Sequence, residues 1–124
     1  MEKRILIVED EQDIREAMAE ALEQEKFVVT TANNGQEGLQ KALSGKPDLI
    51  LLDIVMPVMD GHEMLEKLRT DAWGKTVKVI MLTSMDDVRN IDEAHRGSIT
   101  DYIIKAHSSL NEIINKVKVS IYLQ

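Results

Sequence analysis

Cysteine is missing from this 124-residue sequence. Without cysteine the chain has neither a disulfide framework nor a thiolate metal site, which fits a reducing compartment such as the cytoplasm. A long apolar run is missing too. The start MEKR leads into an apolar run too short for a signal-peptide core, and no later stretch approaches the length that spans a membrane. We therefore expect a soluble, cytoplasmic protein with no membrane contact.

The chain also has fewer basic than acidic residues. The chain has 15 Lys and Arg against 22 Asp and Glu, a formal net charge of −7. Surfaces that bind nucleic acids or anionic lipids cluster Lys and Arg, so this balance argues against both partners. We expect this domain to contact no nucleic acid.

Linkers are absent as well, since the chain has no low-complexity segment and only two prolines. Its hydrophobic content of 44% suits one core of ordinary size. We therefore expect a single domain that fills residues 1–124.

What the sequence does contain is a set of short apolar runs, each followed by a polar residue of a type that phosphoryl chemistry uses. Residues 5–8 lead into Glu9 and Asp10, residues 49–52 into Asp53, residues 77–82 into Thr83, and residues 102–104 into Lys105. Runs without polar alternation are typical of strands covered on both faces, as in a parallel sheet between helices.

Amphipathic segments alternate with these runs. Met18 and Leu22 after the first run, and Met64 and Leu68 after the third, recur at helical spacing. A short β-branched segment, residues 27–31, adds another strand, and Asn34 with Glu37 resembles a capping box that opens a helix. The order is five repeats of strand then helix. It predicts an α/β fold with a doubly wound five-stranded parallel sheet in a three-layer sandwich.

The polar residues that end the runs should meet in space. In open parallel sheets the ligand crevice lies beyond the carboxyl ends of the strands. We therefore expect Glu9, Asp10, Asp53, Thr83 and Lys105 to converge at one edge of the sheet, where they would form one polar site.

Four motifs occur in order at the predicted first, third, fourth and fifth strands: ILIVEDE, LILLDIVMPVMDG, VIMLTSM and DYIIK. Each is weak alone, but together they resemble the receiver domain of two-component response regulators, such as the chemotaxis response regulator, over the whole chain. The resemblance implies the flavodoxin-like strand order 2-1-3-4-5, which periodicity alone does not give.

The resemblance also implies a Mg²⁺-dependent phosphoacceptor site. Asp53 would be the phosphoacceptor, with a loop-capping Asp as the plainer alternative. Asp10, Asp53 and the backbone carbonyl of Val55 would ligate Mg²⁺ directly, and Glu9 would act through water. Clustered carboxylates repel one another unless a hard cation binds between them. Alternatively, Asp10 only caps the first helix.

Three further residues would respond to the phosphoryl group. The Thr83 hydroxyl and the Lys105 ammonium would each contact a phosphoryl oxygen, and Tyr102 would swing inward when Thr83 moves. Each has a structural alternative: Thr83 as an ordinary β-branched strand residue, Lys105 as a snorkelling surface lysine, and Tyr102 as a half-buried strand tyrosine.

The partners implied are those of the family. A histidine kinase or phosphotransfer protein would donate the phosphoryl group, and the switched face would bind a downstream protein target or effector domain. The domain would assist its own phosphorylation and dephosphorylation without being an enzyme in the usual sense.

One departure from the family pattern is Ala106, because proline usually follows the lysine. A cis bond before a residue other than proline costs about 2.5 to 4 kcal/mol. The Lys105–Ala106 bond is therefore either cis and strained, or trans with a rebuilt loop. A trans bond with Lys105 turned away from Asp53 would remove Lys105 from the site. Apolar Val55 and Met85 beside the pocket predict slow loss of the phosphoryl group, because neither helps to orient an attacking water.

Three alternative functions stay open. A Mg²⁺-dependent phosphohydrolase with an Asp nucleophile usually needs a second Asp where this chain has Val55. A flavodoxin-like nucleotide or FMN binder needs a phosphate-cradling Gly- or Thr-rich loop after the first strand, which here is acidic. A receiver that signals without phosphorylation is suggested only by Ala106.

The remaining candidate residues are the histidines and the tryptophan. His62, His95 and His107 lack the spacing of zinc ligands, so we expect them at surface or cap positions. Trp73 should lie at the edge of the sheet opposite the acids.

Overall fold

The computed structural model describes residues 2–95 and 98–122, with residues 90 and 92–94 described by their backbone alone. Over these residues the chain forms a sheet of five strands in the order β2-β1-β3-β4-β5, and every neighbouring pair is parallel. The strands are β1 (Arg4–Val8), β2 (Val28–Ala32), β3 (Leu49–Asp53), β4 (Lys78–Thr83) and β5 (Asp101–Ile104). The predicted fold class and strand order are confirmed.

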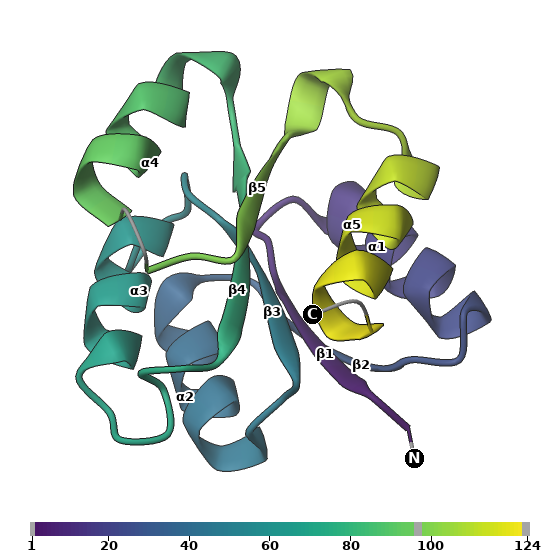
Figure 1. Ribbon diagram of the computed structural model, residues 1–124, viewed down its shortest axis with the longest axis horizontal. Coiled ribbons are helices and arrows are strands. Elements are labelled where there is room, and N and C mark those ends of the chain that lie inside the picture. Colours follow the sequence, from purple (N-terminus) through teal and green to yellow (C-terminus); the bar gives the residue numbers. More distant parts are fainter. Residues whose placement is uncertain (1, 96–97, 123–124) are drawn as a thin grey trace.

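Helices cover both faces of the sheet (Figure 1). Helices α1 (Gln12–Gln24) and α5 (Leu110–Tyr122) lie on one face, and α2 (Gly35–Gly45), α3 (Gly61–Arg69) and α4 (Val88–His95) lie on the other. Two short 3₁₀ turns, η1 (Met85–Asp87) and η2 (Lys105–His107), follow β4 and β5. The result is the expected three-layer sandwich.

The apolar runs form central strands because both of their faces are covered. All five residues of β3 are buried, whereas the edge strand β2 alternates between exposed and partly buried residues. Because strand side chains alternate between faces, each run supplies two cores. Ile5, Ile7, Leu49 and Leu51 pack on the α1 and α5 side, while Leu6, Val8, Ile50 and Leu52 pack on the α2, α3 and α4 side.

The starts of α1 and α2 differ in whether a side chain caps the helix. In α2 the Asn34 side chain accepts a hydrogen bond from the Glu37 amide at 2.9 Å, and the Glu37 carboxylate accepts one from the Asn33 amide at 2.7 Å. The capping function predicted for Asn34 is confirmed. In α1 the capping position belongs to Glu11, whose side chain makes no capping hydrogen bond. The alternative that Asp10 caps this helix is therefore wrong, and its exposed carboxylate remains available at the sheet edge.

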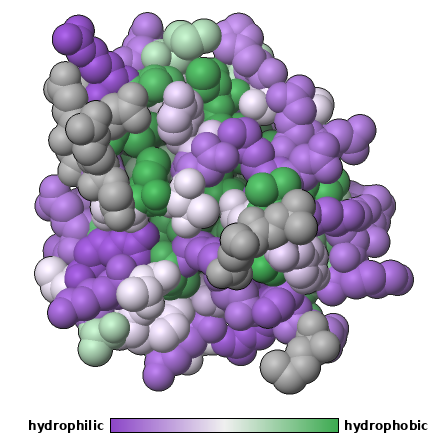
Figure 2. Space-filling view, viewed as in Figure 1, coloured by the Kyte–Doolittle hydropathy of each residue, from purple (hydrophilic) through white to green (hydrophobic). Residues whose placement is uncertain are grey.

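The face of the molecule seen in Figure 2 is largely polar. Figure 2 shows a face dominated by hydrophilic side chains, with hydrophobic ones visible mostly in recesses between them. No helix within the described residues has both the length and the apolar character needed to cross a membrane.

Candidate functional site

The polar residues that follow the strands do meet at the carboxyl edge of the sheet. Asp53 and Thr83 are the last residues of β3 and β4, and Glu9, Asp10 and Lys105 directly follow β1 and β5. A cleft of about 280 Å³ opens at this edge. It is lined by Asp10, Glu11, Asp53, Val55, Thr83, Ser84, Lys105 and Ala106. The predicted convergence is confirmed, with the Glu9 side chain buried below the cleft.

Three carboxylates form the acidic part of the site. Glu9, Asp10 and Asp53 each offer an oxygen atom, and these atoms lie within 4.8 Å of one another. Asp10 is exposed, whereas Glu9 and Asp53 are 0% and 4% exposed. Burial first, and then the neighbouring Glu9 carboxyl, raise the pKa of Asp53 well above its usual value. Like charges at this spacing favour a bound proton or a bound cation.

The acidic group fits a hard divalent cation. All three side chains supply oxygen ligands, which Mg²⁺ prefers. The buried Glu9 Oε2 has no hydrogen-bond partner among the residues that the structure describes. A buried charged oxygen without a partner is costly, and a cation or its bound water would satisfy it.

Lys105 is the cationic part of the site. Its Nζ lies 2.7 Å from Glu9 Oε1 and 3.4 Å from Asp53 Oδ1. Burial alone would lower the pKa of Lys105, but the hydrogen bond to Glu9 and the charge of Asp53 outweigh it and raise the pKa. The ammonium is therefore charged and shared between the two buried acids.

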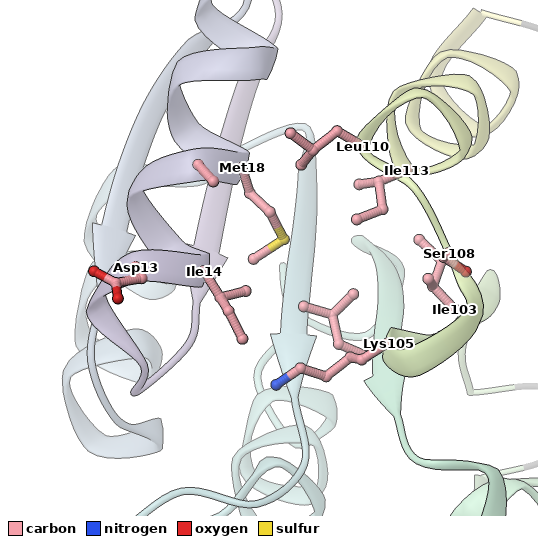
Figure 3. Close-up of a pocket in the computed structure, with 10 residues that line it drawn as sticks. Asp13, Ile14, Met18, Ile103, Lys105, Ser108, Leu110 and Ile113 are labelled. Atoms are coloured by element: carbon pink, nitrogen blue, oxygen red, sulfur yellow. The ribbon is translucent and has the colours of Figure 1, made fainter.

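The stem of Lys105 lies along a second cavity. This cavity of about 300 Å³ between α1 and α5 is mostly apolar, with Ile14, Met18 and Ile113 in its wall (Figure 3). The lysine thus buries its methylene groups against apolar surface and directs its ammonium to the acids. An unpaired surface lysine would show only the first of these features.

Ala106 does not displace Lys105 from the site. The Lys105–Ala106 peptide bond is trans, and the chain continues as the 3₁₀ turn η2. Of the two conformations considered for this bond, the structure has the trans form, and Lys105 still points to Asp53 and Glu9. The condition that would have removed Lys105 from the site is not met.

Thr83 and Tyr102 lie on the neighbouring strands β4 and β5. Thr83 is buried, and its hydroxyl donates to the Ser84 carbonyl at 3.0 Å. Tyr102 pairs with Met81 in the sheet register and is partly buried against the core on the α2, α3 and α4 side. The switch roles of Thr83 and Tyr102 stay a prediction.

Val55 is an apolar residue that lines the cleft, and apolar Met85 directly follows the cleft-lining Ser84 in the chain. Val55 is 72% exposed and lines the cleft, and Met85 in η1 is 58% exposed. Neither side chain offers a strong hydrogen-bond donor or acceptor to a water molecule.

Arg15 is a contact of the site that the sequence motifs did not single out. From α1 its guanidinium donates to the backbone carbonyl of Glu9 at 2.9 Å and approaches that of Asp10 at 3.4 Å. The available clue was its place one helical turn after the acidic loop.

The expectation of a surface position is wrong for His95, although its place as the last residue of α4 agrees with the alternative of a cap position. His95 is 5% exposed at the end of α4, and its Nε2 lies 2.6 Å from Nδ1 of His62 in α3. Sequence spacing could not show this pair because the two residues belong to different helices. Burial first, and then the charge of His62, lower the pKa of His95.

Comparison with known proteins identifies the family. Residues 5–118 match the response regulator receiver domain. The transcriptional regulatory protein ResD of Bacillus subtilis is 37% identical over 117 residues, a match that covers 94% of this chain and 47% of ResD. This chain therefore spans about half the length of that relative.

Solved structures show the same architecture. The chemotaxis response regulator CheY4 of Vibrio cholerae has a TM-score of 0.87 at 25% identity, with 97% of this chain and 99% of that chain covered. The response regulator TrrA of Thermotoga maritima, solved in complex with Mg²⁺-BeF, has a TM-score of 0.83 at 36% identity, with 95% and 98% covered. The chain belongs to the family of response regulator receiver domains, which serve two-component signalling systems.

Proposed function

We propose that this receiver accepts a phosphoryl group on Asp53 with the help of Mg²⁺. The observation that carries the proposal is the placement of Asp53. Its buried carboxylate ends β3 at the cleft, within 4.8 Å of two further acids and 3.4 Å from the ammonium of Lys105. A carboxylate in such a position can act as a nucleophile toward phosphorus once the surrounding negative charge is neutralised.

The donor is a phosphohistidine of a histidine kinase or phosphotransfer protein. An oxygen of Asp53 forms a bond to phosphorus, and the bond between phosphorus and the histidine nitrogen breaks. The histidine nitrogen leaves with that electron pair, and because the other ring nitrogen carries a proton, the donor histidine is restored as a neutral imidazole. The product is an acyl phosphate on Asp53.

The residues that would hold Mg²⁺ are Asp10, Asp53 and the carbonyl of Val55 directly, with Glu9 through water. The acidic donor set and the unpartnered Glu9 Oε2 support this assignment. The cation, when bound, neutralises charge on the phosphoryl oxygens. TrrA, solved with Mg²⁺-BeF, is a relative in which magnesium accompanies this fold.

Thr83 and Lys105 would stabilise the remaining charge. The Thr83 hydroxyl, which here donates to the Ser84 carbonyl, turns to donate to a phosphoryl oxygen. Lys105 exchanges its contact with Asp53 for a contact with a second phosphoryl oxygen. The space vacated by Thr83 admits Tyr102, which changes the surface of α4, β5 and α5.

The changed surface would meet a downstream protein target or an effector domain. ResD is a transcriptional regulatory protein about twice as long as this chain. That relative supports a separate effector region, rather than this acidic receiver, as the part that contacts nucleic acid. The cytoplasmic location expected from the sequence stays a prediction.

The domain would also govern its own dephosphorylation. Val55 and Met85 are exposed and apolar, so nothing at these positions orients an attacking water. We expect slow loss of the phosphoryl group, and a half-life of seconds on labelled protein would contradict this expectation.

Intact-mass analysis after treatment with a small-molecule phosphodonor tests the proposal. Wild type should gain one phosphoryl mass with Mg²⁺ and little without it, and Asp53→Asn should gain none. Asp13→Asn, which changes an exposed Asp on α1, is the matched control and should behave as wild type. A gain that survives in Asp53→Asn contradicts the assignment. Steady phosphate release without a stable phosphoprotein would favour the phosphohydrolase alternative.

A further inference from the structure

We propose that Arg15 is a positioning residue for the cation site, an inference that rests on the Mg²⁺ requirement of the proposed function. Arg15 donates hydrogen bonds to the three carbonyl groups of the loop between β1 and α1. Its Nη1 donates to Glu9 O at 2.9 Å and lies 3.4 Å from Asp10 O, and its backbone amide donates to Glu11 O at 2.9 Å. The side chain of Arg15 thus contacts two carbonyls of the loop that carries two of the site's acids, and the third accepts the first backbone hydrogen bond of α1.

These contacts restrain the backbone that carries the acidic side chains. The Glu9 amide donates to the carbonyl of Ala32 in β2 at 3.0 Å, and Arg15 adds a second restraint at the Glu9 carbonyl. The helix that follows has no side-chain cap. Because no side chain caps this helix, the hydrogen bonds of Arg15 to the Glu9 and Asp10 carbonyls are side-chain contacts that hold the preceding loop.

Order in this loop matters because a divalent cation needs its ligands in place. A loop that must be ordered on binding reduces the affinity by the cost of that ordering. Removing groups that orient metal ligands typically lowers affinity about 10- to 100-fold. We expect the lower end of that range for Arg15, since the Glu9 amide and the start of α1 remain held by other bonds.

The sign of the effect separates positioning from simple electrostatics. Arg15 carries a positive charge near a site for a cation, so Coulomb repulsion alone predicts that removing the charge tightens Mg²⁺ binding. Positioning predicts the opposite, a weaker affinity. The direction in which Mg²⁺ affinity changes therefore distinguishes the two explanations.

The experiment measures Mg²⁺ affinity by titration calorimetry and amide hydrogen exchange of residues 9–11 without metal. Arg15→Gln is compared with wild type, with Arg15→Lys, which keeps the charge but not the forked guanidinium, and with Lys41→Gln. Lys41 is the matched control because it also donates to a backbone carbonyl, that of Thr31 at 2.5 Å, and its loss removes the same charge. Thermal melts verify that each variant is folded.

We expect Arg15→Gln to weaken Mg²⁺ binding about tenfold and to speed amide exchange in the loop, with Arg15→Lys in between. Lys41→Gln should bind as wild type or slightly tighter. Mg²⁺ binding by Arg15→Gln that is equal to or tighter than that of wild type overturns the role of Arg15 alone. A wild type that binds no Mg²⁺ overturns the proposed function together with this inference.

Discussion

At the scale of single residues, the site is a balance of buried charges. Glu9 is 0% exposed, and its ion pair with Lys105 at 2.7 Å is shorter than the 3.4 Å contact between Lys105 and Asp53. In this structure the ammonium of Lys105 therefore pairs more closely with Glu9 than with Asp53. Removing one partner of a buried pair leaves an uncompensated charge, which usually destabilises a protein more than the intact pair stabilises it.

Lys105→Met should therefore lower the free energy of unfolding by about 2 kcal/mol, a value reduced for the partial exposure of the lysine. Adding Glu9→Gln removes the stranded charge, so the double variant should recover at least half of the loss. Urea denaturation of wild type, the two single variants and the double variant measures the coupling energy between Lys105 and Glu9. A Lys105→Met protein as stable as wild type would contradict the pairing.

The sequence predicted which residues meet at the site but not how they pair. Asp53, Thr83 and Lys105 follow strands, so a parallel sheet alone brings them to one edge. The preference of Lys105 for Glu9 depends on side-chain rotamers and on the trans turn η2. The contacts of Arg15 depend on backbone carbonyl directions, which residue spacing does not encode.

At the scale of elements, α3 and α4 are joined by a pair of imidazoles. The ring centroids of His62 and His95 are 4.8 Å apart, and the ring planes differ by 20°, so the rings lie nearly parallel. One proton between the nitrogens, 2.6 Å apart, completes a hydrogen bond. If both rings were fully protonated, both nitrogens would be donors and the bond would be lost.

The pH dependence of stability should reveal this pair. The pKa of His95 is lowered in the folded protein, by burial first, whereas an unfolded histidine binds a proton near pH 6.5. The contribution of neutral His95 to the free energy of unfolding is fully present above about pH 6.5. It falls as the pH drops toward the folded pKa because the unfolded state binds the proton more readily.

Replacing His95 by Gln should therefore flatten the fall in unfolding free energy between about pH 7.5 and about pH 5.5, by up to about 1 kcal/mol per pH unit. Denaturation of wild type and variant across this range measures the slope. His107→Gln is the control because His107 is exposed. Equal slopes in wild type and His95→Gln would contradict the account.

Elements were predictable where the pattern is local. Continuous apolar runs predicted β1, β3, β4 and β5, and Asn34 predicted the start of α2. The start of α1 was less accessible because Glu11 occupies the cap position without a capping bond. The contact between His62 and His95 depends on how α3 and α4 pack on the sheet, and the repeat pattern of either helix alone cannot show it.

At the scale of the whole molecule, the two edges of the sheet have different roles. The acids and Lys105 lie at the carboxyl edge, while Trp73 lies in the loop that precedes β4, at the opposite edge as predicted. The strand order that creates this division came from family resemblance, since five similar apolar runs do not specify their neighbours. With a net charge of −7, the molecule should favour cations at its acidic edge.

Magnesium should therefore stabilise the fold without being sensed by Trp73. A ligand that binds only the folded state raises stability by mass action, so the melting temperature should rise with Mg²⁺, and less so in Asp53→Asn. Trp73 fluorescence below the transition should stay unchanged. Strong quenching of Trp73 fluorescence by Mg²⁺ would contradict the placement of the cation site and Trp73 at opposite edges of the sheet.

The proposed function assigns the phosphoryl group to Asp53. Its most direct test is to treat the protein with a phosphodonor and Mg²⁺, reduce it with borohydride, and sequence its peptides by mass spectrometry. Borohydride converts an aspartyl phosphate to homoserine, which marks the acceptor permanently. The account predicts homoserine at position 53 alone, and only when Mg²⁺ is present. Homoserine at Asp10, or a phosphoryl group retained on another residue with Asp53 unchanged, would contradict it.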